Sequence, residues 1–201
     1  MRIVACYKIV PNDQEISVKG DRTLDTSKAQ LAISRYDLEA VEAAVQFKGA
    51  EDEVCALTVA AEAVDNTKLR KAILSRGPQA LYAVHDEKAE EADSLKTAQT
   101  LKAAIEKIGD VELVLCGEGS EDMYCQQVGP MLGALLGWTN VNAVSKISRS
   151  EKRRGAISKF FFEDRVAPVT PAELEAAHHH EPHAEVEASE VDDAPASIEK
   201  H

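Results

Sequence analysis

The stretch "LVLCGEGSEDMYCQQVGP", residues 113–130, decides which fold the sequence predicts. Four apolar residues end at Gly117, a run of small and acidic residues follows, and an amphipathic helical pattern begins near Gln126. A buried strand that passes through a glycine-containing loop into a helix is half of a strand–helix–strand unit. We therefore predict a parallel sheet that carries this loop at its carboxyl edge.

The same alternation of strand and helix patterns precedes this loop along the chain. The predicted strands are near-continuous apolar runs, which is typical of sheets with both faces covered by helices. We expect a doubly wound α/β domain with a mostly parallel sheet. Strands are predicted at 2–10, 53–60, 80–84, 111–117, 141–147 and 157–162, and helices at 37–48, 67–76, 94–108 and 126–136, with a small hairpin in 14–33.

The charge of the chain is concentrated in its last 35 residues. Residues 167–201 hold nine acids, one base and no aromatic residue, so they account for −8 of the net charge of −12. Such a segment cannot bury enough apolar surface to offset the entropy lost on ordering. We predict a folded domain over 1–166 and a disordered acidic tail over 167–201. The acidic balance also argues against nucleic acid or an anionic membrane surface as a partner.

Targeting features and cysteine usage indicate a cytoplasmic protein. The first residues enter a strand directly, without the pattern of a secretory signal, and no apolar run approaches the ~20 residues that span a bilayer, so no membrane insertion is expected. The four cysteines form no CxxC pair, and we expect reduced thiols. His178, His179, His180 and His183 are metal-ligand types without a fold to preorganise them, and no physiological metal site is predicted.

The loop after the fourth strand has the composition of a ligand site without catalytic groups. Gly117 and Gly119 allow a ligand to approach the backbone closely. The N–H groups of Gln126, Gln127 and Val128 open a helix and can bind an anion such as a phosphate. The loop matches neither the dinucleotide fingerprint nor the P-loop, and it contains no lysine, arginine or histidine and no obvious nucleophile. Two interpretations therefore stay open, a nucleotide-like ligand and an ordinary strand-to-helix turn.

Six segments in order and at matching spacing resemble the beta subunit of electron transfer flavoprotein, in particular the FixA type. The resemblance covers about residues 1–147, and "KFFFEDRV" at 159–166 is similar to the start of the hairpin that follows in that family. The segments are "RIVACYKIVPNDQEISV" at 2–18, "AISRYDLEAVEAAVQFK" at 32–48, "VCALTV" at 54–59, "RKAILSRGPQALYAV" at 70–84, "LVLCGEGSEDMYCQQVGP" at 113–130 and "VNAVSKI" at 141–147.

The resemblance implies an electron carrier subunit that is not a catalyst in its own right. Its fold would be of the adenine-nucleotide-binding type and would hold AMP or a second FAD. An alpha subunit (FixB-like) would carry the main FAD, and the pair would pass electrons from a dehydrogenase donor to a downstream acceptor. The residues that the resemblance assigns to the nucleotide are Cys6, Ser34, Tyr36, Asp37, Val59, Gly117, Gly119, Asp122, Cys125, Gln126, Gln127 and Val128.

Two other functions compete with the electron carrier. The chain could be a stand-alone adenine-nucleotide-binding module, similar to stress proteins on the same fold, or a truncated copy that folds without binding. Co-purification of a flavin-bearing partner separates the first function from the second, and absence of any nucleotide supports the third. At the residue level, Asp37 has an alternative role as an acid in the first turn of its helix.

Overall fold

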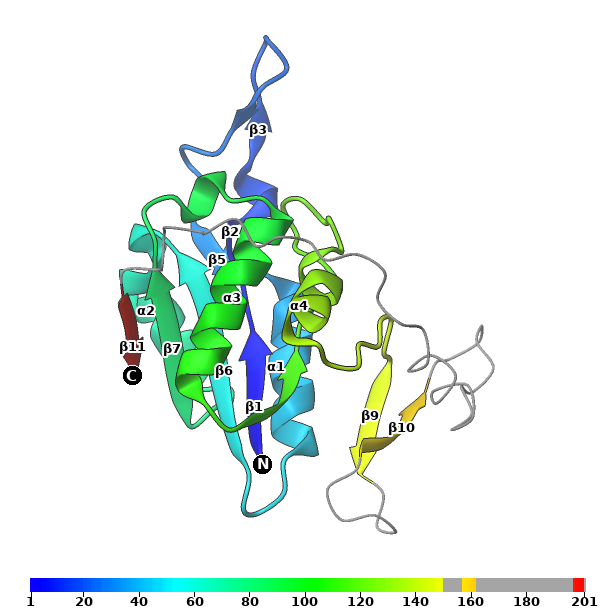
Figure 1. Ribbon diagram of the computed structural model, residues 1–201. Helices are drawn as coiled ribbons and strands as arrows, with labels where there is room; N and C mark the ends of the chain where they lie inside the picture. Colours follow the sequence, from blue (N-terminus) through cyan, green and yellow to red (C-terminus); the bar gives the residue numbers. More distant parts are fainter. Residues whose placement is uncertain (150–156, 162–196, 201) are drawn as a thin grey trace, which may run out of the picture.

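A computed structural model, which describes residues 1–149, 157–161 and 197–200, shows an α/β fold around one five-stranded sheet (Figure 1). Four of its strands are parallel, as predicted, and the fifth runs antiparallel to β7 at the edge. In spatial order the strands are β11 (Ser197–Lys200), β7 (Ala80–His85), β6 (Glu53–Ala60), β1 (Arg2–Cys6) and β8 (Val111–Leu115).

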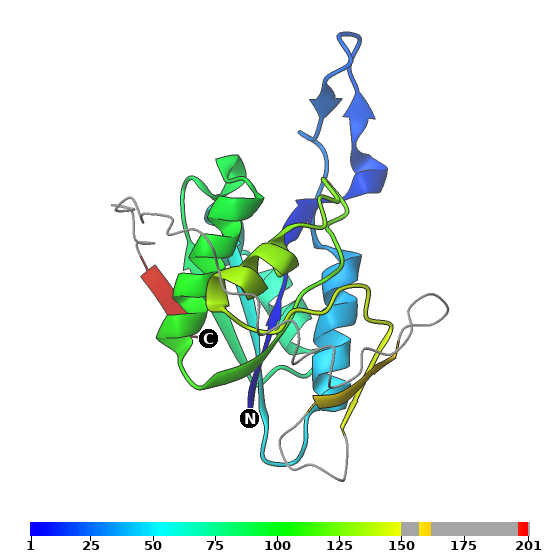
Figure 2. The same ribbon diagram turned by 45° about the vertical axis from the view of Figure 1, so that its right-hand side comes forward.

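Helices cover both faces of the sheet, which confirms the doubly wound arrangement (Figures 1 and 2). On one face, α1 (Arg35–Phe47) and α2 (Thr67–Leu74) pack on apolar side chains of β1, β6 and β7. On the other face, α3 (Ser94–Ile108) and α4 (Val128–Leu136) pack over a second apolar cluster. The strands are therefore buried on both sides, as their apolar sequences predict.

Local capping signals fix where the helices begin and end. The Asn66 side chain accepts hydrogen bonds from the backbone N–H groups of Lys68 (3.0 Å) and Leu69 (3.2 Å), which starts α2. The Asp93 side chain caps α3 in the same way, because it accepts a hydrogen bond from the backbone N–H of Lys96 at 2.7 Å. Gly109 ends α3 with φ 71°, a backbone conformation that glycine adopts at little cost. These boundaries follow from sequence patterns that are short and local.

The predicted fifth parallel strand at 141–147 is wrong. The extended segment begins later, as β9 (Lys146–Arg149), and it pairs antiparallel with β10 (Ile157–Phe161) in a separate two-stranded sheet. Ala143 has φ 52°, which interrupts an extended run, and Val144 is 39% exposed rather than covered on both faces. Ile147 packs against the cluster under α1, so this hairpin lies beside α1 in both views.

The strand predicted at 2–10 is divided into two strands at the carboxyl edge of the sheet. After β1 the chain forms β2 (Ile9–Pro11), which pairs with β5 (Leu31–Ile33) outside the main sheet. The predicted hairpin between them is present as β3 (Ser17–Val18) and β4 (Leu24–Asp25). It projects beyond the carboxyl ends of the strands (Figures 1 and 2). Short 3-10 turns complete the fold: η1 (Asp13–Glu15), η2 (Glu62–Asp65) and η3 (Ala89–Glu91).

Most of the predicted acidic tail lies outside the described residues, so the domain boundary at residue 166 and the disorder of 167–196 stay predictions, whereas the prediction of disorder is wrong for 197–200. The part of the tail that the structure describes, β11, pairs with β7 in the register Ser197 to His85 and Lys200 to Tyr82. The sequence did not predict this strand, because no periodic apolar pattern marks it.

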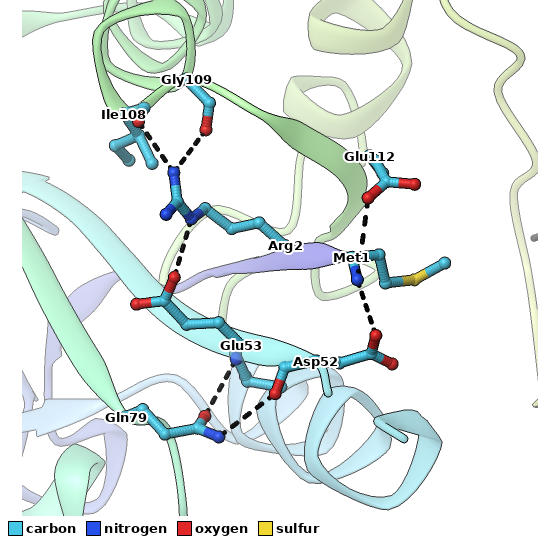
Figure 3. A network of polar contacts seen from close by, with 9 residues as sticks. Met1, Arg2, Asp52, Glu53, Gln79, Ile108, Gly109 and Glu112 are labelled. Atoms are coloured by element: carbon cyan, nitrogen blue, oxygen red, sulfur yellow. Dashed lines mark hydrogen bonds and ion pairs between the residues drawn. The ribbon is translucent and has the colours of Figure 1, made fainter. Parts of the chain in front are cut away.

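A network of polar contacts ties the amino ends of the strands together (Figure 3). The Met1 ammonium lies 2.7 Å from an Asp52 carboxylate oxygen and 3.7 Å from Glu112. Arg2 on β1 donates to Glu53 on β6 (2.8 Å) and to the carbonyl oxygens at the end of α3 (3.0 and 2.7 Å). Gln79 accepts from the backbone N–H of residue 54 at 2.9 Å. This network connects β8, β1, β6 and the segment before β7.

Candidate functional site

The order of the parallel strands creates a switch point at the carboxyl edge of the sheet, where a ligand crevice is expected. Along the sheet, β7, β6 and β1 follow one another in reverse chain order, and β8 then lies on the other side of β1. The connections that leave β1 and β8 therefore run to opposite faces of the sheet. In open α/β sheets, ligands bind outside the carboxyl ends of the strands at this switch point. The loop that opened the sequence analysis follows β8 and lies there.

Asp37 bridges the two loops of the switch point. It lies in the first turn of α1 and is 7% exposed. Its carboxylate accepts a hydrogen bond from the backbone N–H of Lys8, after β1 (2.8 Å), and another from the backbone N–H of Gly117, after β8 (3.1 Å). One side chain thus holds the two loops of the switch point together. Contact with a nucleotide stays a prediction for this residue.

The environment of Asp37 disfavours its charge. Burial raises its pKa from 3.8 to about 6, and the two backbone N–H donors and the nearby Lys8 charge only partly oppose this rise. Among the described residues, no ion pair involves Asp37. The switch point therefore contains a carboxyl group that changes charge close to neutral pH.

Two buried hydroxyl groups lie at or near this edge without a hydrogen-bond partner among the described residues. Ser34 is the N-cap residue of α1, and its side chain makes no capping bond. Its closeness to the Asp37 carboxylate nevertheless lowers the pKa of that group. Thr58, near the end of β6, is likewise buried and unpartnered. Because buried polar atoms are usually satisfied, these hydroxyls are available to a ligand or a water molecule.

Acidic side chains of the loop form ion pairs with cations from distant parts of the chain. Lys8 donates to an Asp122 carboxylate oxygen at 2.6 Å. Arg35 contacts Glu121 twice, through its side chain and through its backbone N–H (3.0 Å). Partial burial raises the pKa of Asp122, but Lys8 and the Ser120 hydroxyl hold it below the usual value. Sequence analysis did not single out either cation: Lys8 lies inside the strand predicted at 2–10, and Arg35 precedes the helix predicted at 37–48.

Aromatic packing shapes the outer part of the loop. The rings of Tyr36 and Tyr124 lie 5.2 Å apart at an interplanar angle of 43°. A Cβ atom on Gly119 would lie 2.5 Å from the Tyr124 ring, so this position has no room for a side chain. Tyr124 and Gln126 have positive φ angles of 45° and 57°, which are uncommon for residues other than glycine. Tyr124 therefore lies against two predicted contact residues, Tyr36 and Gly119, but was not itself among the predicted contacts.

The remaining predicted contacts spread along the start of α4. The helix begins at Val128, later than expected, with Gln127 as its N-cap residue and no side-chain cap. Gln126 precedes the helix and donates to Glu118 at 2.8 Å. Cys125 is exposed, and Val59 packs in the apolar cluster that also contains Cys6. The structure thus brings Ser34, Tyr36, Asp37, Gly117, Gly119 and Asp122 together at the switch point, whereas Cys6 and Val59 pack in the apolar cluster under α3 and α4.

Two other kinds of site are missing from the part of the chain that the structure describes. That part contains no group of three or more histidine, cysteine, aspartate or glutamate residues placed to bind a metal ion. The histidines at 178–180 and 183 lie outside it. Its helices are too short or too polar to cross a membrane.

Comparison with protein families gives one finding. A family model described as "Electron transfer flavoprotein domain" matches residues 21–161 of the chain. The matched region spans α1 to α4 and includes the loop after β8 and the separate β9–β10 hairpin. It also contains the Asp37 side chain and its Gly117 partner, so the crevice lies largely within the matched region.

Proposed function

Because the chain belongs to the electron transfer flavoprotein family, we propose that it is a beta subunit of the FixA type that holds AMP or a second FAD at the switch point. It would pair with an FAD-bearing alpha subunit and pass electrons from a dehydrogenase donor to a downstream acceptor. The family match over residues 21–161 is the observation that carries this proposal. No catalytic residue is assigned, because flavin supplies the redox chemistry in such a carrier and the protein supplies position and electrostatics.

The residues of the switch point support an adenine nucleotide in two respects. Gly117 and Gly119 allow the loop to pack closely on Asp37 and Tyr124, where an added Cβ would clash. The unpartnered Ser34 hydroxyl can donate to a ligand oxygen. The free N–H groups at the start of α4 can bind a phosphate, since the N-cap residue Gln127 leaves them without a side-chain partner.

The cations beside the loop determine how a phosphate would bind there. Lys8 and Arg35 are the cations nearest the loop, and both contact loop carboxylates. A bound phosphate would compete with Asp122 and Glu121 for these cations. The proposed nucleotide therefore binds with an exchange of ion partners, in which each cation keeps an anionic neighbour throughout.

Nucleotide analysis of the purified protein tests the proposal. The full chain is produced with and without a cognate alpha subunit, then denatured, and the released nucleotides are identified by absorbance and mass. One FAD and one AMP per heterodimer indicate a conventional carrier, and two FAD indicate a bifurcating one. A single colourless chain that releases AMP and ignores the alpha subunit would instead establish a stand-alone nucleotide-binding module.

Two matched variants test whether the nucleotide binds at the switch point. Ser34→Ala removes the unpartnered buried hydroxyl and should lower the nucleotide content after purification. Thr100→Val is the control, because Thr100 is also a buried hydroxyl residue but lies on α3, where it bonds to the Lys96 carbonyl at 3.0 Å. Equal nucleotide content in the two variants would argue against the crevice as the binding site.

A further inference from the structure

Two cysteines lie side by side where β1 and β8 end. Cys6 is the last residue of β1, and Cys116 directly follows β8. These parallel strands pair in the register Ala5 to Leu115, which places Cys6 opposite Cys116 one residue further on. Neighbouring strands lie about 4.8 Å apart, within the range of about 4.4–6.8 Å between Cα atoms joined by a disulfide. The backbone spacing therefore allows a bond between the two residues.

Both thiols point to the same face of the sheet. Cys6 is a buried member of the apolar cluster under α3 and α4, and Cys116 is a half-buried neighbour of that cluster. Contact with the Cys116 thiol and burial together raise the pKa of Cys6 well above its ordinary value, and the nearby Asp37 charge adds to this rise. Cys6 is thus kept protonated and shielded, whereas Cys116 is the accessible member.

We propose that Cys6 and Cys116 form a redox-active thiol pair that closes to an intramolecular disulfide by exchange with a low-molecular-weight disulfide. In the first step the Cys116 thiolate attacks the reagent, one reagent thiolate leaves, and a mixed disulfide forms on Cys116. In the second step the Cys6 sulfur loses its proton and attacks the Cys116 sulfur, which releases the second reagent thiolate. The protein loses two electrons and two hydrogens, and the reagent disulfide is reduced to two thiols.

The pair is placed to act on the loop. Gly117 directly follows Cys116, and its N–H donates to Asp37. A disulfide between Cys6 and Cys116 would fix the point where the loop leaves the sheet.

Thiol counting and disulfide mapping on the folded full chain test the proposal. The Cys125→Ser chain is used, because Cys125 is exposed and would react separately. DTNB, an aromatic disulfide, serves as the reagent. We expect two reagent thiols released per chain, a loss of two hydrogens from the intact mass with no retained adduct, and a crosslinked Cys6–Cys116 peptide. A stable adduct on Cys116 beside an alkylatable Cys6, or no reaction of either thiol, would overturn the proposal.

Two further variants keep the outcome clear. Cys6→Ser should trap the mixed disulfide on Cys116, because no neighbouring thiol can displace the reagent. Cys55→Ser is the control, since Cys55 lies fully buried in the middle of β6, and the crosslink should form in it unchanged. If Cys6→Ser fails to fold, the peptide map of the Cys125→Ser chain still decides the result. A crosslink to Cys55 in the native chain would count against the proposed pair.

Discussion

The two ends of the parallel sheet bury charge in opposite ways. At the amino end, Arg2 and the Met1 ammonium each contact a carboxylate, and Arg2 also bonds to two carbonyl oxygens (Figure 3). At the carboxyl end, the buried charge is Asp37, and two backbone N–H groups are its only hydrogen-bond donors at bonding distance among the described residues. One end pairs opposite charges directly, and the other holds a carboxylate mainly by backbone N–H dipoles, with the Lys8 charge nearby but not in an ion pair with it.

This difference separates stability from function. A buried charge with a charged partner keeps its ionisation state over a wide pH range. A buried charge held mainly by dipoles changes its ionisation state more easily, and Asp37, with a pKa of about 6, does so close to neutral pH. Perturbed pKa values of this kind cluster at functional sites. We therefore expect changes at the amino end to affect unfolding alone, and changes at the carboxyl end to affect unfolding, pH dependence and the loop together.

The largest effect is expected from Gly117→Ala, which breaks the carboxyl end. The added methyl group would lie 2.4 Å from the Asp37 carboxylate and 2.8 Å from the backbone of residues 36 and 37. Backbone atoms cannot move aside as a flexible side chain can, so we expect a loss of about 3 kcal/mol or more in the free energy of unfolding. Urea unfolding followed by circular dichroism measures it.

Gly20→Ala is the matched control for this variant. No atom lies within 4 Å of the position that its Cβ would occupy. The free energy of unfolding should stay within about 0.5 kcal/mol of the parent value. Equal unfolding curves for the two variants would mean that the close approach of Gly117 to Asp37 does not hold the switch point together.

The second largest effect concerns the pH dependence of stability at Asp37. Its pKa in the folded chain, about 6, is higher than the ordinary 3.8, so the folded state binds this proton more tightly than the unfolded state. The contribution of Asp37 is therefore greatest below pH 4, declines as the pH rises through about 6, and is flat above pH 7. A shift of this size corresponds to about 2–3 kcal/mol.

Comparison with Asp37→Asn isolates this contribution. The amide cannot ionise, so the stability of the parent relative to the variant should fall by that amount between pH 4 and pH 7. Asp52→Asn is the control at the amino end, where the carboxylate is paired with the Met1 ammonium. Its difference from the parent should not fall over this range. A parallel pH profile for the parent and Asp37→Asn would show that Asp37 titrates as an ordinary exposed carboxyl group.

A smaller effect is expected from Arg2→Met, which breaks the amino end. The substitution removes an ion pair with Glu53 and two hydrogen bonds to carbonyl oxygens, while it keeps the apolar stem. Because the Arg2 side chain is 27% exposed, water compensates part of the loss, and we expect about 1–2 kcal/mol. Urea unfolding measures it, and a double-mutant cycle with Glu53→Gln separates the ion pair from the carbonyl contacts. The variant should keep the parent's pH dependence between pH 5 and 7.

Local sequence patterns predicted most elements but little of the charge arrangement. The strand at 53–60 and the helix at 94–108 have the predicted bounds, because unbroken periodicity and capping residues determine them. The segment 141–147 misled, because a short apolar run does not reveal a left-handed residue at Ala143. Lys8 and Arg35 reach the loop only after strand order brings segments 114 and 86 residues apart together. Such contacts depend on tertiary structure, which a single sequence does not display.

The smallest effect on stability is expected from Lys8→Met, which sharpens the comparison at the carboxyl end. The pair with Asp122 lies at the surface, so its loss should lower the free energy of unfolding by less than about 1 kcal/mol. Its effect on the loop should be larger than its effect on the whole chain. Amide hydrogen exchange in residues 118–127 should become faster, and added salt should accelerate exchange less in the variant than in the parent chain, because only the Arg35–Glu121 pair remains to be screened.

Arg70→Met is the control for this last variant. Arg70 forms a comparable surface pair with Asp65 at 2.9 Å, but that pair lies between η2 and α2, away from the loop. Exchange in residues 118–127 should not change in this variant. If Lys8→Met leaves loop exchange at the parent rate, the Arg35–Glu121 contacts and the Tyr36–Tyr124 packing hold the loop without the Lys8–Asp122 pair. The two ends of the sheet would then differ only in the buried charge of Asp37.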